Sequence, residues 1–162
     1  MKTLIIGITA LLVAGLCLAQ TPETKPNETK FYKLDFAVKE LEAGKVVNSR
    51  TYSTSVATNG KASVRTQDRV QVSGGKPGEW SYIDVGVNID CNLMLAGPNT
   101  VSMHVTADVS GFVNPEHDRN IVQNRWSSDV VTQLRKATTL FSSDGASSKR
   151  QTQLEVTVTP IQ

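Results

Sequence analysis

Residues 82–95, YIDVGVNIDCNLML, place an apolar side chain at every second position. This pattern restricts the possible folds of the chain more than any other feature of the sequence. The apolar members are Ile83, Val85, Val87, Ile89, Cys91, Leu93 and Leu95. Side chains on a strand point alternately to its two faces, so this period predicts a strand with one dry face and one wet face. The wet face carries Asp84, Asn88, Asp90 and Asn92, which fit either a site or a solvated surface.

The same alternation returns along the rest of the chain, with turn residues between the segments. It is found over residues 32–39, 61–72, 101–110 and 151–159. Asn59-Gly60 predicts a tight hairpin between residues 46–58 and 61–72. About eight strands and no convincing helical period predict an all-β fold, an antiparallel β-sandwich or a partly closed barrel. We expect residues 31–162 to form this single β domain.

The N-terminus, MKTLIIGITALLVAGLCLAQ, has one basic residue, an apolar run from Leu4 to Leu18 and a small residue at Ala19. This pattern is typical of a secretory signal peptide, which we expect as a helix over residues 1–19. Residues 20–30 hold two prolines and no apolar side chain, so they predict a flexible leader. A periplasmic or secreted location follows, with membrane contact only through the signal segment.

The net charge argues against a nucleic-acid-binding protein, and the cysteine content argues against an internal disulfide. Removing Lys2 with the signal leaves 16 of the 17 basic residues against 15 acidic ones, formally +1. A chain so close to neutral lacks the clustered basic face that nucleic acids need, so no nucleic-acid partner is expected. Removing Cys17 leaves Cys91 alone, which cannot form an internal disulfide and is expected to pack as a small hydrophobe.

No constellation of residues in the sequence indicates catalysis. The G-x-S-x-G signature of serine hydrolases is absent, and His104 and His117 are the two histidines. The Ser-Ser-Asp stretches at residues 127–129 and 142–144 are ordinary for turns and strand edges. We therefore expect a protein that is not an enzyme. A hydrolase built on Ser127 or Ser142 with one of the histidines is the hypothesis against which this expectation is tested.

Metal ions and cofactors are not expected either. Glu116, His117 and Asp118 are consecutive, and consecutive side chains do not readily aim at one ion. The glycine-containing stretch at residues 73–78, SGGKPG, has Pro77 where a phosphate loop needs Ser or Thr for magnesium. We interpret this stretch as a hairpin connection.

Three aromatic residues are the candidates for binding. They are Trp80, Tyr82 and Trp126. Exposed aromatic rings on a β face bind sugars or proteins, and by parity Trp80 and Tyr82 share the polar face of their strand. The alternative is that each ring closes an open edge of the core. Exposed rings would favour the binding role, and buried rings would favour closure of the core.

Four stretches carry a resemblance that spans nearly the whole mature chain. They are FYKLDFAVKELEAGKVVNSRTYS, YIDVGVNIDC, NRWSSDVV and SSDGASSKRQTQLEVTVTPI. Together they resemble a family of small, uncharacterised exported bacterial β-proteins. That resemblance implies an exported β domain and brings no established activity.

A second resemblance covers residues 82–159. Asp84-Val85-Gly86-Val87, then a hairpin, then Arg125 before another hairpin is similar to the C-terminal module of outer-membrane secretins, which assemble into gated rings. This chain has TLFSSDGASSK at residues 139–149 in place of the glycine-rich turn, and it lacks the proline-rich closing segment. The resemblance therefore implies a β topology and not a pore.

These observations lead to one functional hypothesis and one alternative. The hypothesis is a non-catalytic exported β domain that acts by binding or assembly in the cell envelope, because exposed sheet edges accept partner strands. The partner would be an envelope protein, or another copy joined through edge strands. The alternative is a sugar- or lipid-binding module that uses Trp80, Tyr82 or Trp126.

Overall fold

The computed structural model describes residues 29–73, 76, 78–114, 118–145 and 150–161. The expected signal-peptide helix over residues 1–19, most of the expected leader and His117 lie outside these residues. The cleavage after Ala19 and the leader therefore stay predictions.

Eight strands make up the described chain, which confirms the all-β prediction. They are β1 (Phe31–Glu42), β2 (Lys45–Ala57), β3 (Lys61–Ser73), β4 (Trp80–Gly97), β5 (Thr100–Asn114), β6 (Asp118–Gln133), β7 (Thr138–Asp144) and β8 (Arg150–Ile161). No helix occurs among the residues described, so none there has the length and apolar character to cross a membrane.

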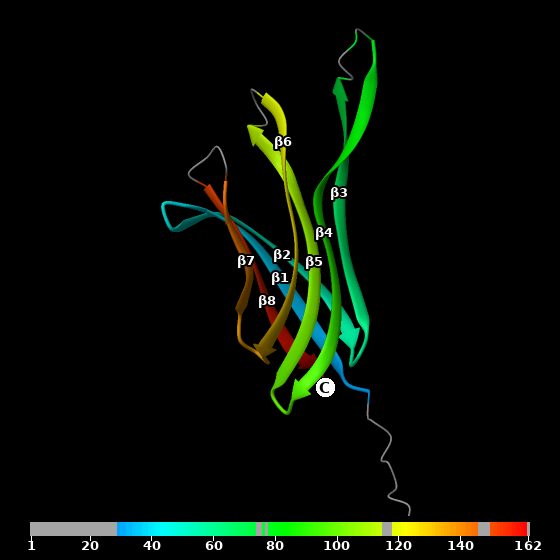
Figure 1. The fold of residues 1–162 in the computed structure, drawn as a ribbon, viewed down its shortest axis with the longest axis vertical. Coiled ribbons are helices and arrows are strands. Elements are labelled where there is room, and N and C mark those ends of the chain that lie inside the picture. The colour runs from blue at the N-terminus through cyan, green and yellow to red at the C-terminus, as the bar shows by residue number, and fades with distance from the viewer. Residues whose placement is uncertain (1–28, 74–75, 77, 115–117, 146–149, 162) are drawn as a thin grey trace, which may run out of the picture.

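The strands form two separate antiparallel sheets. Sheet A has the order β2-β1-β8-β7, and sheet B has the order β3-β4-β5-β6. Figure 1 shows sheet A crossing behind sheet B, with the two layers face to face in the lower half of the molecule. Because no strand pairs across the two sheets, the fold is a β-sandwich and not a partly closed barrel.

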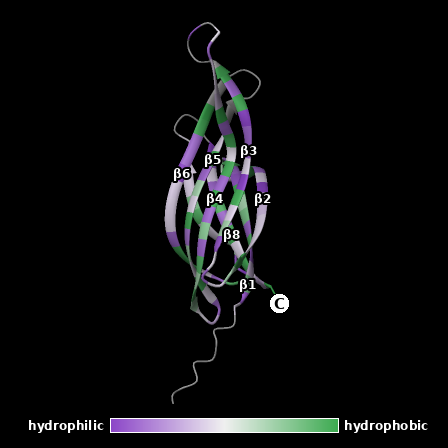
Figure 2. Ribbon diagram, turned by 90° about the vertical axis from the view of Figure 1, so that its right-hand side faces the viewer, coloured by the Kyte–Doolittle hydropathy of each residue, from purple (hydrophilic) through white to green (hydrophobic). Residues whose placement is uncertain are grey.

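The core lies between the sheets and is built from the alternating residues. Leu34 and Phe36 of β1 and Val156 of β8 face Leu93 of β4 and Met103 of β5, all with 1% exposure or less. Figure 2 shows hydrophobic and hydrophilic residues alternating along the strands. The two-residue period of the sequence is therefore the period of burial.

Cys91 belongs to this core, as its place in the alternation predicts. It is buried and free, and burial raises the pKa of its thiol to about 11. A thiol with so high a pKa stays protonated and unreactive at neutral pH. Cys91 therefore acts as a small apolar side chain.

Two sequence expectations about strand ends were wrong. Ile83 and Leu95, placed on the dry face by their parity, are 41% and 46% exposed, whereas the alternate residues from Val85 to Leu93 are buried. The reason is length, because β4 runs past both ends of the core that sheet A covers. Parity fixes the face of a side chain, but only the opposite sheet decides whether that face is covered.

The Asn59-Gly60 turn was also misassigned. Asn59 has a positive φ of 58°, but the turn joins β2 of sheet A to β3 of sheet B and closes no hairpin. β2 pairs instead with β1, and β3 pairs with β4. The chain thus changes layers at this turn, which lets both sheets present apolar faces to one core.

Gly86 marks the point where β4 separates from β5. Its φ is +149°, and a Cβ there would lie 2.1 Å from the Thr66 carbonyl oxygen. The Gly86 N–H donates to the Ser110 hydroxyl at 3.0 Å, and the paired residues of β4 and β5 begin at Val87 and Val109. From Trp80 to Gly86, β4 pairs with β3 alone.

The free two-stranded part, residues 67–73 and 80–86, is here named the β3–β4 arm. Its pairing continues to Ser73 and Trp80. Figure 1 shows the arm projecting beyond the rest of the sandwich, at the upper right.

Candidate functional site

The outer face of sheet B carries polar side chains in three rows that run across the strands. The rows are Lys61, Asn92, His104 and Asp129; then Ser63, Asp90, Thr106 and Ser127; then Arg65, Asn88, Asp108 and Arg125. The alternation of each strand puts these residues on the face opposite the core, and the register aligns them. This polar face brings ionisable groups, hydroxyls and amides of all four strands of sheet B together.

Ion pairs neutralise much of the polar face. The Arg65 guanidinium donates to both carboxylate oxygens of Asp90, at 2.7 and 2.9 Å. The hydrogen bond from Arg65, followed by one from Ser63, holds the pKa of the Asp90 carboxyl below its usual value. Arg125 likewise donates to Asp108 at 2.8 Å. These contacts bind the strands of sheet B to one another.

His104 lies between an acid and a hydroxyl. Its Nδ1 is 2.8 Å from the Asp129 carboxylate, and its Nε2 is 3.3 Å from the Ser127 hydroxyl. This order of contacts is that of a serine-hydrolase triad. Ser127 with a histidine was weighed from the sequence, but its meeting with His104 and Asp129 could not be predicted, because β5 and β6 bring the three residues together only through their register.

The surroundings of this trio do not suit hydrolysis. The side chains of His104 and Asp129 are 45% and 83% exposed. A triad needs an acid that is buried, and an oxyanion site from which water is excluded. The adjoining depression, which Lys61, Asn92 and Thr106 help to line, lies on the same open face. We interpret the trio as a cross-strand hydrogen-bond ladder.

This interpretation predicts that the trio has no esterase activity. We expect the purified protein to hydrolyse p-nitrophenyl acetate no faster than its Ser127→Ala and His104→Ala variants, in a spectrophotometric assay. Ser142→Ala is the matched control, because it removes the serine of the other Ser-Ser-Asp stretch. A loss of turnover in the first two variants, with Ser142→Ala unaffected, would show that the trio is catalytic.

The three aromatic candidates lie in two different environments. Trp80 and Tyr82 are each 58% exposed on the outer face of the β3–β4 arm, and the Arg69 guanidinium lies 5.1 Å from the centre of the Tyr82 ring. Trp126 is partly buried and stacks on Phe141, with ring centres 4.0 Å apart. Trp126 thus packs β6 of sheet B against β7 of sheet A, while Trp80 and Tyr82 remain accessible.

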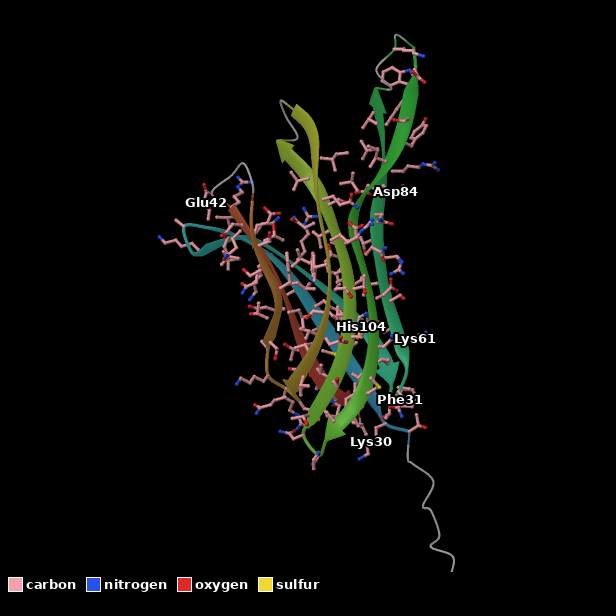
Figure 3. All side chains as sticks on the ribbon, in the orientation of Figure 1. Lys30, Phe31, Glu42, Lys61, Asp84 and His104 are labelled. Atoms are coloured by element: carbon pink, nitrogen blue, oxygen red, sulfur yellow. The ribbon has the colours of Figure 1, made fainter. Side chains whose placement is uncertain are left out.

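Figure 3 places these regions relative to one another. Asp84 lies near the base of the β3–β4 arm, whereas His104 and Lys61 lie lower on sheet B. The exposed aromatic pair and the polar rows are therefore separate regions of one sheet. Within the described residues, no group of three or more His, Cys, Asp or Glu side chains could hold a metal ion.

The outer edge of sheet B at β3 presents unpaired backbone groups. Leu93 donates its N–H to the Gly60 carbonyl at 3.0 Å. This bond shows which residues of β3 are hydrogen-bonded to β4 and which are not. In an antiparallel ladder, residues bonded to the neighbouring strand alternate with residues whose N–H and C=O point away from it. Because the register from Lys61 to Ser73 has no shift, the odd-numbered residues of β3 point these groups outward.

The edge at β6 follows the same rule. Leu134 donates its N–H to the Asn99 carbonyl at 3.0 Å, and the β5–β6 register continues unshifted from Gln133 to Ile121. Odd-numbered residues of β6 therefore point their N–H and C=O groups away from β5. These include Ser127 and Asp129, whose side chains lie on the polar face.

Comparison with known proteins finds likeness in structure only. No protein-family model and no curated protein matches the chain. Among solved structures, it is similar to the type III secretin InvG of the Salmonella SPI-1 injectisome, with 6% identity, a TM-score of 0.49 and coverage of 83% of this chain and 64% of that chain. It is also similar to the type II secretin XcpQ of Pseudomonas aeruginosa, with 8% identity, a TM-score of 0.49 and coverage of 82% and 57%.

A third similar structure is Aeromonas hydrophila ExeD, with 9% identity, a TM-score of 0.50 and coverage of 82% of this chain and 47% of that chain. The chain thus spans between about half and two thirds of the proteins it resembles. The weak secretin-like similarity expected from residues 82–159 is confirmed as a likeness of fold.

Proposed function

We propose that this chain is a non-catalytic, exported β domain that acts by assembly in the cell envelope, and that copies join through the two edges of sheet B. The observation that carries the proposal is the complementarity of β3 and β6. Export and a periplasmic or secreted location are supported by the signal-peptide pattern over residues 1–19.

Strand direction supports the junction. Sheet B is antiparallel throughout, so β3 and β6 run in opposite directions at its two edges. When β6 of one copy lies beside β3 of the next, the two strands are antiparallel, and the alternation of the sheet continues across the junction. A head-to-tail contact of this kind can repeat from copy to copy.

The backbone phase and the faces agree with the same junction. Both edges turn the N–H and C=O groups of odd-numbered residues outward, and both put odd-numbered side chains on the polar face. Pairing odd with odd residues therefore makes the inter-copy hydrogen bonds and keeps the polar face continuous. Lys61 of β3 and Asp129 of β6, at opposite ends of one polar row, also bring opposite charges to the two edges.

Both edges carry charged side chains, but neither is protected by a short strand or by proline. β3 and β6 are 13 and 16 residues long, and neither contains proline. Natural proteins protect their edges with short strands, prolines or coverings, because a long free edge is a template for another strand. Edges of this length, without proline, are therefore suited to pairing with a strand of another copy.

Ser63→Pro tests the proposal. Ser63 is odd-numbered, so proline there removes an outward N–H of β3 and leaves the β3–β4 ladder bonded. We expect the wild-type protein, purified after export, to form assemblies, and Ser63→Pro to be mostly monomeric. Light scattering coupled to size-exclusion chromatography measures both masses.

Ser63→Ala is the matched control. It removes the hydrogen bond from the Ser63 hydroxyl to Asp90, as proline does, but it keeps the backbone N–H. We expect Ser63→Ala to assemble like the wild type. A wild-type protein that is monomeric at high concentration, or a Ser63→Pro variant that assembles normally, would contradict assembly through β3.

A further inference from the structure

The β3–β4 arm has apolar side chains on both of its faces. Trp80 and Tyr82 lie on the outer face, each 58% exposed. Ile83, 41% exposed, lies on the other face beside its cross-strand partner Val70, and Val72 follows on that same face. Val70 and Val72 are half-buried, so the exposed apolar side chains of the arm are Trp80 and Tyr82 on one face and Ile83 on the other.

Nothing else in the described chain covers this surface. β4 pairs with β5 only from Val87, so the arm is a ribbon of two strands without a neighbour in the sheet. Among the residues described, sheet A packs on the lower part of sheet B, while the arm projects past it (Figure 1). Exposed apolar side chains gathered in this way mark a contact with something outside the molecule.

The charges of the arm and its tip nearly cancel. Arg69 and Lys76 are basic, and Asp68, Glu79 and Asp84 are acidic. Arg69 and Asp84 are cross-strand partners, so the two signs lie side by side on the ribbon, which matches a surface that itself carries paired positive and negative groups. Such a balance does not favour a strongly charged partner, whether an anionic lipid surface or an acidic protein.

We propose that the β3–β4 arm contacts a zwitterionic lipid surface and inserts Trp80 and Tyr82 among the headgroups. A lipid surface can surround both faces of a ribbon at once, whereas a protein groove covers one face. Tryptophan and tyrosine have an apolar ring and a polar group, and they are the side chains enriched at the membrane–water interface. The proposal adds a second membrane contact to the signal segment expected from the sequence.

The backbone limits how deeply the arm enters. Residues 80–86 have no partner strand on the β5 side, and β3 has none on its outer side. Unpaired N–H and C=O groups are too costly in hydrocarbon, so they keep the arm in the hydrated headgroup region. Seven extended residues reach roughly 20 Å, which is ample for Trp80 and Tyr82 to enter that region while the sandwich stays outside.

Vesicle flotation tests the proposal. The probe is neutral phosphatidylcholine vesicles, and the protein is the exported form, whose N-terminus is verified so that a retained signal peptide does not bind the lipid. We expect the wild type to float with the vesicles, and Trp80→Ser/Tyr82→Ser to lose about tenfold in partitioning. Ile83→Asn, on the other face, is expected to lose several-fold.

Two controls separate lipid contact from other causes. Phe31→Ser changes an exposed ring on β1, away from the arm, and is expected to bind vesicles like the wild type. Ser63→Pro is expected to retain vesicle binding, which separates this inference from assembly through the edges. Circular dichroism confirms that each variant is folded.

Three results would overturn the inference. One is a wild-type protein that does not float with neutral vesicles. Another is binding that survives Trp80→Ser/Tyr82→Ser. The third is binding lost in that variant but unchanged in Ile83→Asn, which would mean that lipid contacts only one face of the arm and does not surround it.

Discussion

Replacing Gly86 with alanine is expected to lower the free energy of unfolding by about 3–5 kcal/mol, because two independent penalties act at this position. The new Cβ would lie 2.1 Å from the Thr66 carbonyl oxygen, a backbone atom that cannot turn aside. The φ of +149° is also a conformation that residues with a Cβ avoid. Urea denaturation followed by circular dichroism measures the change.

Gly111→Ala is the matched control for this prediction. Gly111 lies on β5, and a Cβ there would have no atom within 4 Å and requires no positive φ. We expect Gly111→Ala to change the free energy of unfolding by less than about 1 kcal/mol, since the added methyl meets no obstacle. Equal effects of the two substitutions would contradict the steric clash and the strained φ on which the Gly86 prediction is based.

Phe36→Ala is expected to lower the free energy of unfolding by about 3–5 kcal/mol, the usual effect of removing a fully buried ring. Phe36 lies in the middle of β1 and is 1% exposed, among residues of both sheets. The loss combines the hydrophobic transfer of the ring with the cavity left behind. Thermal and urea denaturation both measure it.

The control lies on the same strand. Phe31 is 53% exposed at the start of β1, so Phe31→Ala removes the same ring from a place where water already reaches it. We expect a change below about 1 kcal/mol. A loss at Phe31 as large as the loss at Phe36 would mean that the core does not lie where the two sheets face each other.

The strands and the core were predictable because both depend on local alternation. The alternate residues from Val87 to Leu93 are buried, as their two-residue period indicated. The prediction failed where the answer depended on another sheet. Ile83 has the same parity as Val87, but no strand of sheet A lies over it, and Asn59-Gly60 turns the chain between layers that the sequence does not reveal.

The candidate site was only partly predictable, for a related reason. Parity placed Trp80 and Tyr82 on the wet face, and both rings are exposed. The contacts of His104 with Ser127 and Asp129 depend on how β5 and β6 slide along each other, which the sequence does not encode locally. Trp126 was treated as equivalent to Trp80, because its stacking partner Phe141 comes from the other sheet.

Assembly and lipid contact use different parts of sheet B and are compatible. The β3 edge from Lys61 to Thr66 is available for a neighbouring copy. The β3–β4 arm projects from the same sheet past this edge (Figure 1). Copies joined edge to edge would carry their arms at the same end of the assembly. All arms of one assembly would then face the same lipid surface.

Hydrogen–deuterium exchange resolved to single residues tests edge assembly most directly. If copies join through β3 and β6, the outward amides of Arg65 and Ser127 exchange slowly in the wild type and quickly in the Ser63→Pro variant. The Val105 amide, inside the sheet, stays protected in both. Edge amides that exchange as quickly in the wild type as in Ser63→Pro, while Val105 stays protected, would contradict the account.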